Sequence, residues 1–263
     1  SRYSFKLTEN KLVIEGKVKL QKLNGSTKPD DVAFYQKFIL SDNGRDFFNY
    51  LTNPPENKKN YLTEIEYLGK LGFLYSYKTE IELKDLSALK YLIEEKEEIE
   101  TNEEEVNKPV PVNQVVELKP EKLILAHPGD FVGEIDDFYF QETDAINSAF
   151  DSVSEFKRIV QNQVGVRIFR DGFGVKPYGI DGQDWLKLSG GQTSGSSFYG
   201  LRPGNVIGFV SITAERNGWL KEKTDREGFA ESPYSQNFFT LLGKVIDEIN
   251  DKLEGTRRSY NGY

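Results

Sequence analysis

Residues 164–178, VGVRIFRDGFGVKPY, determine the fold prediction for the second half of the chain. Two apolar, β-branched segments, 164–170 and 173–178, flank the dipeptide Asp171-Gly172. Asp-Gly is favoured in two-residue hairpin turns because both central positions need a positive φ. The stretch therefore predicts two antiparallel strands joined by a tight turn.

Further elements are expected on both sides of this hairpin. Residues 131–140 carry a strand pattern, and apolar residues at a spacing of three or four predict a helix over 144–163. A strand is expected over 205–213, and Ser232-Pro233 predicts the start of the last helix, with Ser as N-cap. The glycine- and serine-rich residues 179–204 favour a surface loop, with a lid that orders on a ligand as the alternative.

The first half of the chain is less regular. Alternating apolar residues over 3–23, with a break at Glu9-Asn10-Lys11, predict a hairpin. Apolar residues fit one face of a helix over 83–106, namely Leu83, Leu86, Leu89, Leu92 and Ile93. The segment ends in a run of eight Glu and one Lys at 94–105. We expect a solvated helix end there, or alternatively an acidic partner- or metal-binding surface. The expected division is 1–128, with N-terminal strands and an acidic helical elaboration at about 41–116, and a core at 129–263.

Composition excludes several kinds of site. The 263 residues contain no Cys and one His, so thiolate and multi-histidine metal sites, disulfides and cysteine nucleophiles are absent. A net charge of −8 disfavours a broad nucleic-acid surface, and no apolar run is long enough to cross a membrane. His127 is expected to be structural or exposed. Asp136 and Asp137 should point to opposite faces of a strand, with surface placement favoured. The absence of Met suggests that the natural protein extends beyond Ser1.

Residues 224–227, Thr-Asp-Arg-Glu, form the most informative local motif. They match a capping box, in which Thr224 caps a helix and Glu227 folds back three residues later. The alternative function keeps this cap and uses Arg226 at the helix N-terminus to hold a phosphate. Local chemistry alone favours the cap without the anion site.

The second half resembles the transducer, or middle, domain of bacterial heat-shock-90-like ATPases of the GHKL superfamily. The resemblance covers roughly 129–252. The matching segments are 129–134, 138–140, 165–173, 175–179, 184–186, 206–210 and 223–229. It implies an α+β, ribosomal-protein-S-five second-domain-like fold, with a mixed or antiparallel sheet, a left-handed βαβ crossover and packed helices.

The resemblance also implies a function. The chain would couple ATP binding and hydrolysis in a preceding domain to conformational change, with Arg226 contacting the γ-phosphate. Thr224, Glu227 and Arg170 are expected to contribute to nucleotide contacts. ATP and Mg would be held mainly by the preceding domain, because Asp42-Asn43-Gly44-Arg45-Asp46 lacks the final glycine of the family's nucleotide motif. The chain alone should be inactive.

The expected partner is the chain's own ATP-binding domain in the cytoplasm, and the resemblance allows a homodimer. Neither a membrane nor nucleic acid is expected as a partner. A non-catalytic protein-interaction module with the same fold, acting through its acidic helix and exposed aromatic residues, is the alternative. An independent hydrolase is disfavoured by the missing motifs.

Overall fold

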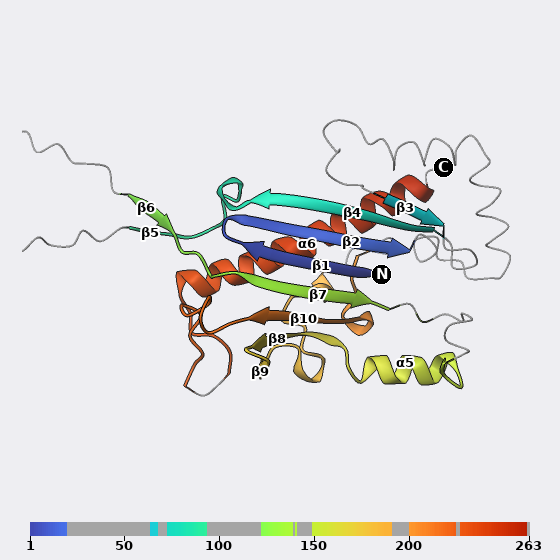
Figure 1. The fold of residues 1–263 in the computed structure, drawn as a ribbon. Coiled ribbons are helices and arrows are strands. Elements are labelled where there is room, and N and C mark those ends of the chain that lie inside the picture. Colours follow the sequence, from blue (N-terminus) through green and yellow to red (C-terminus); the bar gives the residue numbers. More distant parts are fainter. Residues whose placement is uncertain are drawn as a thin grey trace, which may run out of the picture.

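The computed structural model describes residues 1–19, 64–67, 73–93, 122–138, 140, 149–190, 200–224 and 227–261. These residues form an eight-stranded sheet with one long helix behind it and a separate two-stranded ribbon (Figure 1). The architecture is mixed α+β, as expected. No helix among the described residues is long and apolar enough to cross a membrane.

The sheet is antiparallel except for one pair of strands. Its spatial order is β3-β4-β2-β1-β7-β10-β8-β9, and only β10 and β8 run parallel. The strands are β1 (Arg2–Thr8), β2 (Lys11–Lys19), β3 (Glu64–Tyr67), β4 (Phe73–Glu82), β7 (Phe131–Asp137), β8 (Gly165–Arg170), β9 (Phe173–Val175) and β10 (Val206–Ile212). The sheet crosses the boundary expected after residue 128, because β1 pairs with β7.

Both predicted hairpins are present. β1 and β2 pair from Arg2↔Lys17 to Thr8↔Lys11, with Glu9 and Asn10 in the turn. β8 and β9 meet at Asp171-Gly172, where φ is 51° and 84°. The positive φ at both turn positions is the backbone geometry that favoured Asp-Gly in the sequence.

The core lies between the sheet and α6 (Pro233–Asn261), which runs behind the strands (Figure 1). Alternate residues of β1 and β2 are buried on this face, including Tyr3, Phe5 and Ile14. Helix α6 covers them with apolar residues spaced three or four apart: Phe238, Leu241, Leu242, Val245, Ile246, Ile249 and Leu253. The start of α6 was predicted correctly, because Ser232 Oγ accepts the Ser235 N–H at 3.1 Å.

Two aromatic side chains cover glycines on neighbouring strands. Gly16 of β2 is the cross-strand partner of Tyr77, and Gly133 of β7 is the partner of Phe5. A Cβ at either glycine would collide with the ring of its partner. The glycines therefore let these large rings lie flat against the sheet and fill the space under α6.

The helix predicted over 83–106 is wrong for its described part. Leu83–Asp85 is a 3₁₀ turn, and Tyr91–Ile93 is strand β5, which pairs with β6 (Leu123–Leu125). Long-range bonds override the helical spacing here, since Leu83 N donates to Asn10 O at 2.9 Å. The acidic run 94–105 lies outside the described residues.

The other predicted helix is interrupted. Helix α5 spans Val153–Gln161 within the expected 144–163, residue 149 is also helical, and residues 150–152 between them are not. Residues 141–148 lie outside the described part. Ser152 accepts the Glu155 N–H at 3.1 Å, and Glu155 in turn accepts the Asp151 N–H at 3.0 Å. These two bonds place the helix start at Val153.

One smaller expectation also needs correction, and another holds. Asp137 is buried at the end of β7 while Asp136 faces outward to Arg2, so only one of the two carboxylates is at the surface. In its described part, the predicted loop over 179–204 is confirmed as a connection without strand or α-helix, and it contains short 3₁₀ turns at Ile180–Gly182, at 188–190 and at the start of Pro203–Asn205. Residues 191–199, which include most of the Gly/Ser stretch, lie outside the described residues.

The connection between the parallel strands β8 and β10 is not the single α-helix of a simple βαβ crossover. β8 and β10 are joined through β9 and these short 3₁₀ turns, and the described residues of this connection contain no α-helix. Helix α5 instead joins β7 to β8, which run in opposite directions because β10 is antiparallel to β7 and parallel to β8.

Candidate functional site

The described residues on both sides of Arg226, 221–224 and 227–230, pair as the two arms of a hairpin-like loop, here called the 221–230 loop. Two backbone bonds join its arms: Lys223 N donates to Gly228 O at 2.9 Å, and Ala230 N donates to Lys221 O at 2.7 Å. Between them, Glu222 and Phe229 form an antiparallel β-bridge. Thr224 and Glu227 are exposed on its two arms. Residues 225 and 226 lie outside the described residues.

The capping-box interpretation of residues 224–227 is wrong. Helix α6 begins at Pro233, and the described residues on either side of Arg226 belong to the two arms of the loop. The motif has the composition of a cap, but Glu222 and Phe229 are paired across the loop instead. An anion site at Arg226 would therefore depend on the loop and not on a helix dipole.

Arg170 of β8 anchors the 221–230 loop to the sheet. Its Nη1 lies 3.1 Å from Glu222 Oε1, its Nη2 donates to Leu220 O, and its guanidinium lies 5.4 Å from the centre of the Phe229 ring. The side chain is 19% exposed. Through these contacts Arg170 positions the loop. They also place Arg170 close to the segment that contains Thr224 and Glu227.

Tyr178 holds the other arm of the loop. Its hydroxyl accepts the Phe229 N–H at 3.1 Å, and the two rings stack with centres 5.6 Å apart. Gly228 has a φ of 91°, and a Cβ there would lie 2.6 Å from the Tyr178 hydroxyl oxygen. Burial raises the pKa of Tyr178. The sequence analysis did not identify this contact, because Tyr178 and Phe229 are far apart in the chain.

An aromatic cluster connects the loop to helix α6. The cluster is made of Tyr178, Trp185, Phe229, Phe238 and Phe239, with neighbouring ring centres 5.2–6.3 Å apart. Such edge and offset contacts stabilise beyond simple area burial. The loop is thus packed against both the β8–β9 hairpin and the long helix.

A second candidate site is an open cleft at the end of the sheet, here called the ribbon cleft. Its volume is about 680 Å³. It is lined by Glu9, Asn10, Ile124, Leu125, His127, Gly129, Asp130 and Arg216. The β1–β2 turn, strand β6 and the segment after β10 therefore meet here.

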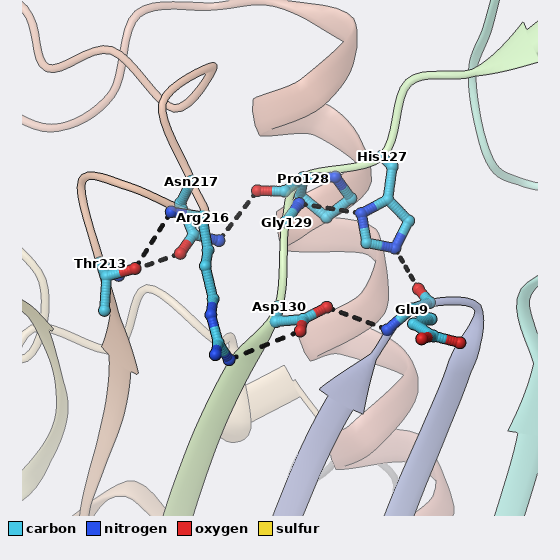
Figure 2. Close-up of polar contacts among 8 residues, drawn as sticks. All are labelled: Glu9, His127, Pro128, Gly129, Asp130, Thr213, Arg216 and Asn217. Atoms are coloured by element: carbon cyan, nitrogen blue, oxygen red, sulfur yellow. Dashed lines mark hydrogen bonds and ion pairs between the residues drawn. The ribbon is translucent and has the colours of Figure 1, made fainter.

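Polar contacts organise one wall of the ribbon cleft (Figure 2). Asp130 accepts the Glu9 N–H at 2.9 Å and lies 3.6 Å from Arg216 Nη1. His127 Nδ1 accepts the Gly129 N–H at 3.0 Å, while its Nε2 bonds to Glu9 O. Because Nδ1 accepts the Gly129 N–H, the ring proton belongs on Nε2, which donates to Glu9 O. His127 is therefore structural, as expected.

Asn217 supports this wall from behind. Its fully buried side chain donates to Pro128 O at 2.9 Å and accepts the Thr213 N–H at 3.0 Å (Figure 2). Gly129, with a φ of 90°, packs against it, and a Cβ there would lie 2.6 Å from Asn217 Nδ2. The turn that presents Arg216 is therefore held rigidly against β7.

The described residues contain no group of three or more His, Asp or Glu side chains that could hold a metal ion. Comparison with known proteins identifies no relative: no family model, no curated protein and no solved structure matches this chain.

Proposed function

We propose that the chain is the transducer domain of a heat-shock-90-like ATPase, which relays ATP binding and hydrolysis in a separate nucleotide-binding domain. In this proposal Arg226 reaches the γ-phosphate and stabilises its charge during transfer. The specific transducer fold, the ATP and Mg dependence and the cytoplasmic location belong to the same proposal.

One observation carries the proposal most directly. The residues that resemble the family form one connected unit, in which Arg170 and Tyr178 hold the two arms of the 221–230 loop. An arginine that senses a phosphate needs a loop whose ends are positioned by the domain that will move. Arg170, expected beside the nucleotide, would on this view act as a positioning residue through its bond to Glu222.

ATP turnover in the protein that joins this chain to its nucleotide-binding domain tests the proposal. We expect Arg226→Ala to lower kcat by about 100-fold or more with a smaller change in KM, because the arginine acts on the transferring phosphate. Arg158→Ala on α5 is the matched control and should keep the wild-type rate. Wild-type turnover in Arg226→Ala would overturn the proposal.

Calorimetry on this chain alone gives a second test. We expect no binding of Mg-ATP, because the nucleotide would be held by the other domain. Tight binding would contradict that division of labour and would direct attention to residues 42–46.

A second candidate is a non-catalytic interaction module. It is favoured by the β5–β6 ribbon, whose cross-strand pair Ile93 and Leu123 is 56% and 62% exposed. Exposed apolar side chains grouped in this way are typical of protein contacts. Unchanged turnover in Arg226→Ala, together with a bound protein partner, would support it.

A further inference from the structure

Asn217 and Gly218 place a chemically labile dipeptide in a fully buried position. Asparagine followed by glycine is prone to deamidation, because glycine has no Cβ to shield its backbone nitrogen, which can attack the amide carbon of the asparagine. Asn217 is nevertheless 0% exposed. The same dipeptide occurs at 24–25, 43–44 and 261–262, but only at 217–218 do both residues belong to the described part of the chain.

The fold holds the Asn217 amide at both ends, within the turn 213–220, here called the Arg216 turn (Figure 2). Asn217 Nδ2 donates to Pro128 O at 2.9 Å, and its Oδ1 accepts the Thr213 N–H at 3.0 Å. Because a carbonyl faces one end and an N–H faces the other, the orientation of the amide is fixed. The backbone is held as well, since Asn217 N donates to Thr213 O and Leu220 N donates to Asn217 O, both at 3.0 Å.

Cyclisation at this dipeptide is blocked while these bonds hold. The succinimide ring is nearly planar, so its closure turns the asparagine side chain from a staggered rotamer into an eclipsed one. This rotation moves the Asn217 amide out of line with Pro128 O and Thr213 N, so both of its bonds must break. Gly129 leaves little room on one side, because a Cβ there would lie 2.6 Å from Asn217 Nδ2. Deamidation therefore needs the Arg216 turn to open first.

Gly218 itself is not required by the backbone or by packing. It is not among the glycines with a positive φ, whereas Gly129 has a φ of 90°. A Cβ at Gly218 would meet only Ala214 O, at 3.4 Å, which is van der Waals contact. Alanine would therefore fit at this position and leave the turn in place. The two glycines thus allow the chemistry at Asn217 and the stability of the turn to be changed separately.

We propose that Asn217 is a latent modification site, at which deamidation releases the Arg216 turn irreversibly. When the turn opens, Gly218 N attacks the Asn217 Cγ and forms a new C–N bond. The Cγ–Nδ2 bond breaks, and the side-chain amino group leaves as ammonia with the proton that Gly218 N has lost. One water molecule then hydrolyses the succinimide to aspartate or isoaspartate. Water is the only co-reactant, and nothing is oxidised or reduced.

Neither product can rebuild the contacts of the native turn. The carboxylate of aspartate has no N–H for Pro128 O, so two acceptors would face each other in a buried place. In isoaspartate the main chain runs through the former side-chain carbons, and the carbonyl oxygen that accepts the Leu220 N–H becomes part of a free carboxylate. Leu220 O also accepts Arg170 Nη2, so the change extends to one anchor of the 221–230 loop.

Mass spectrometry of the full chain measures the modification. Cleavage after glutamate isolates the peptide Arg216–Glu222, which holds no other asparagine. We expect deamidation of Asn217 to be at least about tenfold slower in the native protein than in the urea-unfolded chain, where the other Asn-Gly pairs serve as internal references. Gly129→Ala places a Cβ against Asn217 Nδ2 and should open the turn. That variant should expose the Thr213 amide to hydrogen exchange and deamidate at least about tenfold faster than the wild type.

Gly218→Ala is the matched control, because it keeps the bonds of Asn217 but shields the attacking nitrogen. It should melt at or above the wild-type temperature, and in Gly129→Ala/Gly218→Ala deamidation should fall at least about tenfold while the Thr213 amide stays exposed. The proposal is overturned by equal rates in the native and unfolded chain, by no gain in Gly129→Ala, by no loss in the double variant, or by a protected Leu220 amide in the deamidated protein. If Gly129→Ala does not fold, the wild type in urea below its unfolding midpoint supplies the open turn. None of these outcomes depends on ATP turnover.

Discussion

The hydroxyl of Tyr178 accepts the backbone N–H of Phe229 at 3.1 Å, and the two rings stack 5.6 Å apart across 51 residues of sequence. This contact fixes one arm of the 221–230 loop, while Arg170 fixes the other through Glu222. The loop is therefore bonded to the β8–β9 region and packed against α6. Each of its two anchors, Arg170 and Tyr178, can be tested separately.

Removing the Tyr178 hydroxyl should destabilise the protein. Tyr178→Phe leaves the Phe229 N–H without its acceptor in a half-buried place, at a cost of about 1–2 kcal/mol in the free energy of unfolding. Urea denaturation measures the change. Tyr234→Phe is the control, because Tyr234 stacks on Trp219 near the surface. Equal losses in both variants would contradict a special role for the Tyr178 bond.

The same hydroxyl should make stability fall in alkali. Burial raises the pKa of Tyr178 in the folded state above its ordinary value of 10.0. The folded protein then holds the proton more tightly than the unfolded chain, so this contribution is complete below pH 10 and is lost as the pH rises towards the folded-state pKa. Unfolding followed from pH 8 to about pH 11 should show a shallower loss in Tyr178→Phe than in the wild type.

Arg170 should control the local stability of the 221–230 loop. In Arg170→Ala the bonds to Glu222 and Leu220 O and the contact with the Phe229 ring are lost together. We expect exchange of the Ala230 amide to rise at least about tenfold, which corresponds to about 1.4 kcal/mol. Arg2→Ala, which breaks the exposed Arg2–Asp136 pair on the opposite side of the sheet, should leave that amide unchanged.

Two glycines with similar backbone angles should respond differently to alanine. Gly129 and Gly172 have φ values of 90° and 84°. A Cβ at Gly129 would collide with Arg216 O and crowd Asn217, whereas nothing lies within 4 Å of a Cβ at Gly172. Gly172→Ala should cost about 1 kcal/mol from backbone strain alone, and Gly129→Ala about 3 kcal/mol or more. Thermal unfolding of the pair measures the difference, and similar values would show that the Arg216 turn yields easily.

Asn237 should determine whether the ribbon stays attached to α6. Asn237→Asp keeps one acceptor for Lys90 N but removes the donors to Lys90 O and Ala126 O. We expect a loss of about 2–4 kcal/mol and faster exchange of the Ala126 amide. The control Asn250→Ala removes one bond, to Leu201 N, and should leave the ribbon amides protected.

Several elements could be predicted from the sequence because their signals are local. Asp171-Gly172 needs only its own backbone angles to form a turn, and Ser232-Pro233 needs only its own side chain and ring to begin a helix. The alternation in β1 and β2 likewise reports one buried face. These residues establish the two hairpins and the last helix before any long-range contact is known.

Other choices were made by residues far apart in the chain. The spacing of Leu83, Leu86 and Leu89 fits a helix equally well. In the fold, however, Asn10 O accepts the Leu83 N–H and the Asn237 side chain accepts the Lys90 N–H, so these backbone groups bond outside a helix. Thr224 and Glu227 have the spacing of a cap, but the bridge between Glu222 and Phe229 makes them the arms of a loop. Capping and periodicity contribute less than about 2 kcal/mol each, so buried aromatic contacts and backbone bonds from other elements outweigh them. Tertiary structure alone therefore decided where Arg170 points and which residues meet in the ribbon cleft.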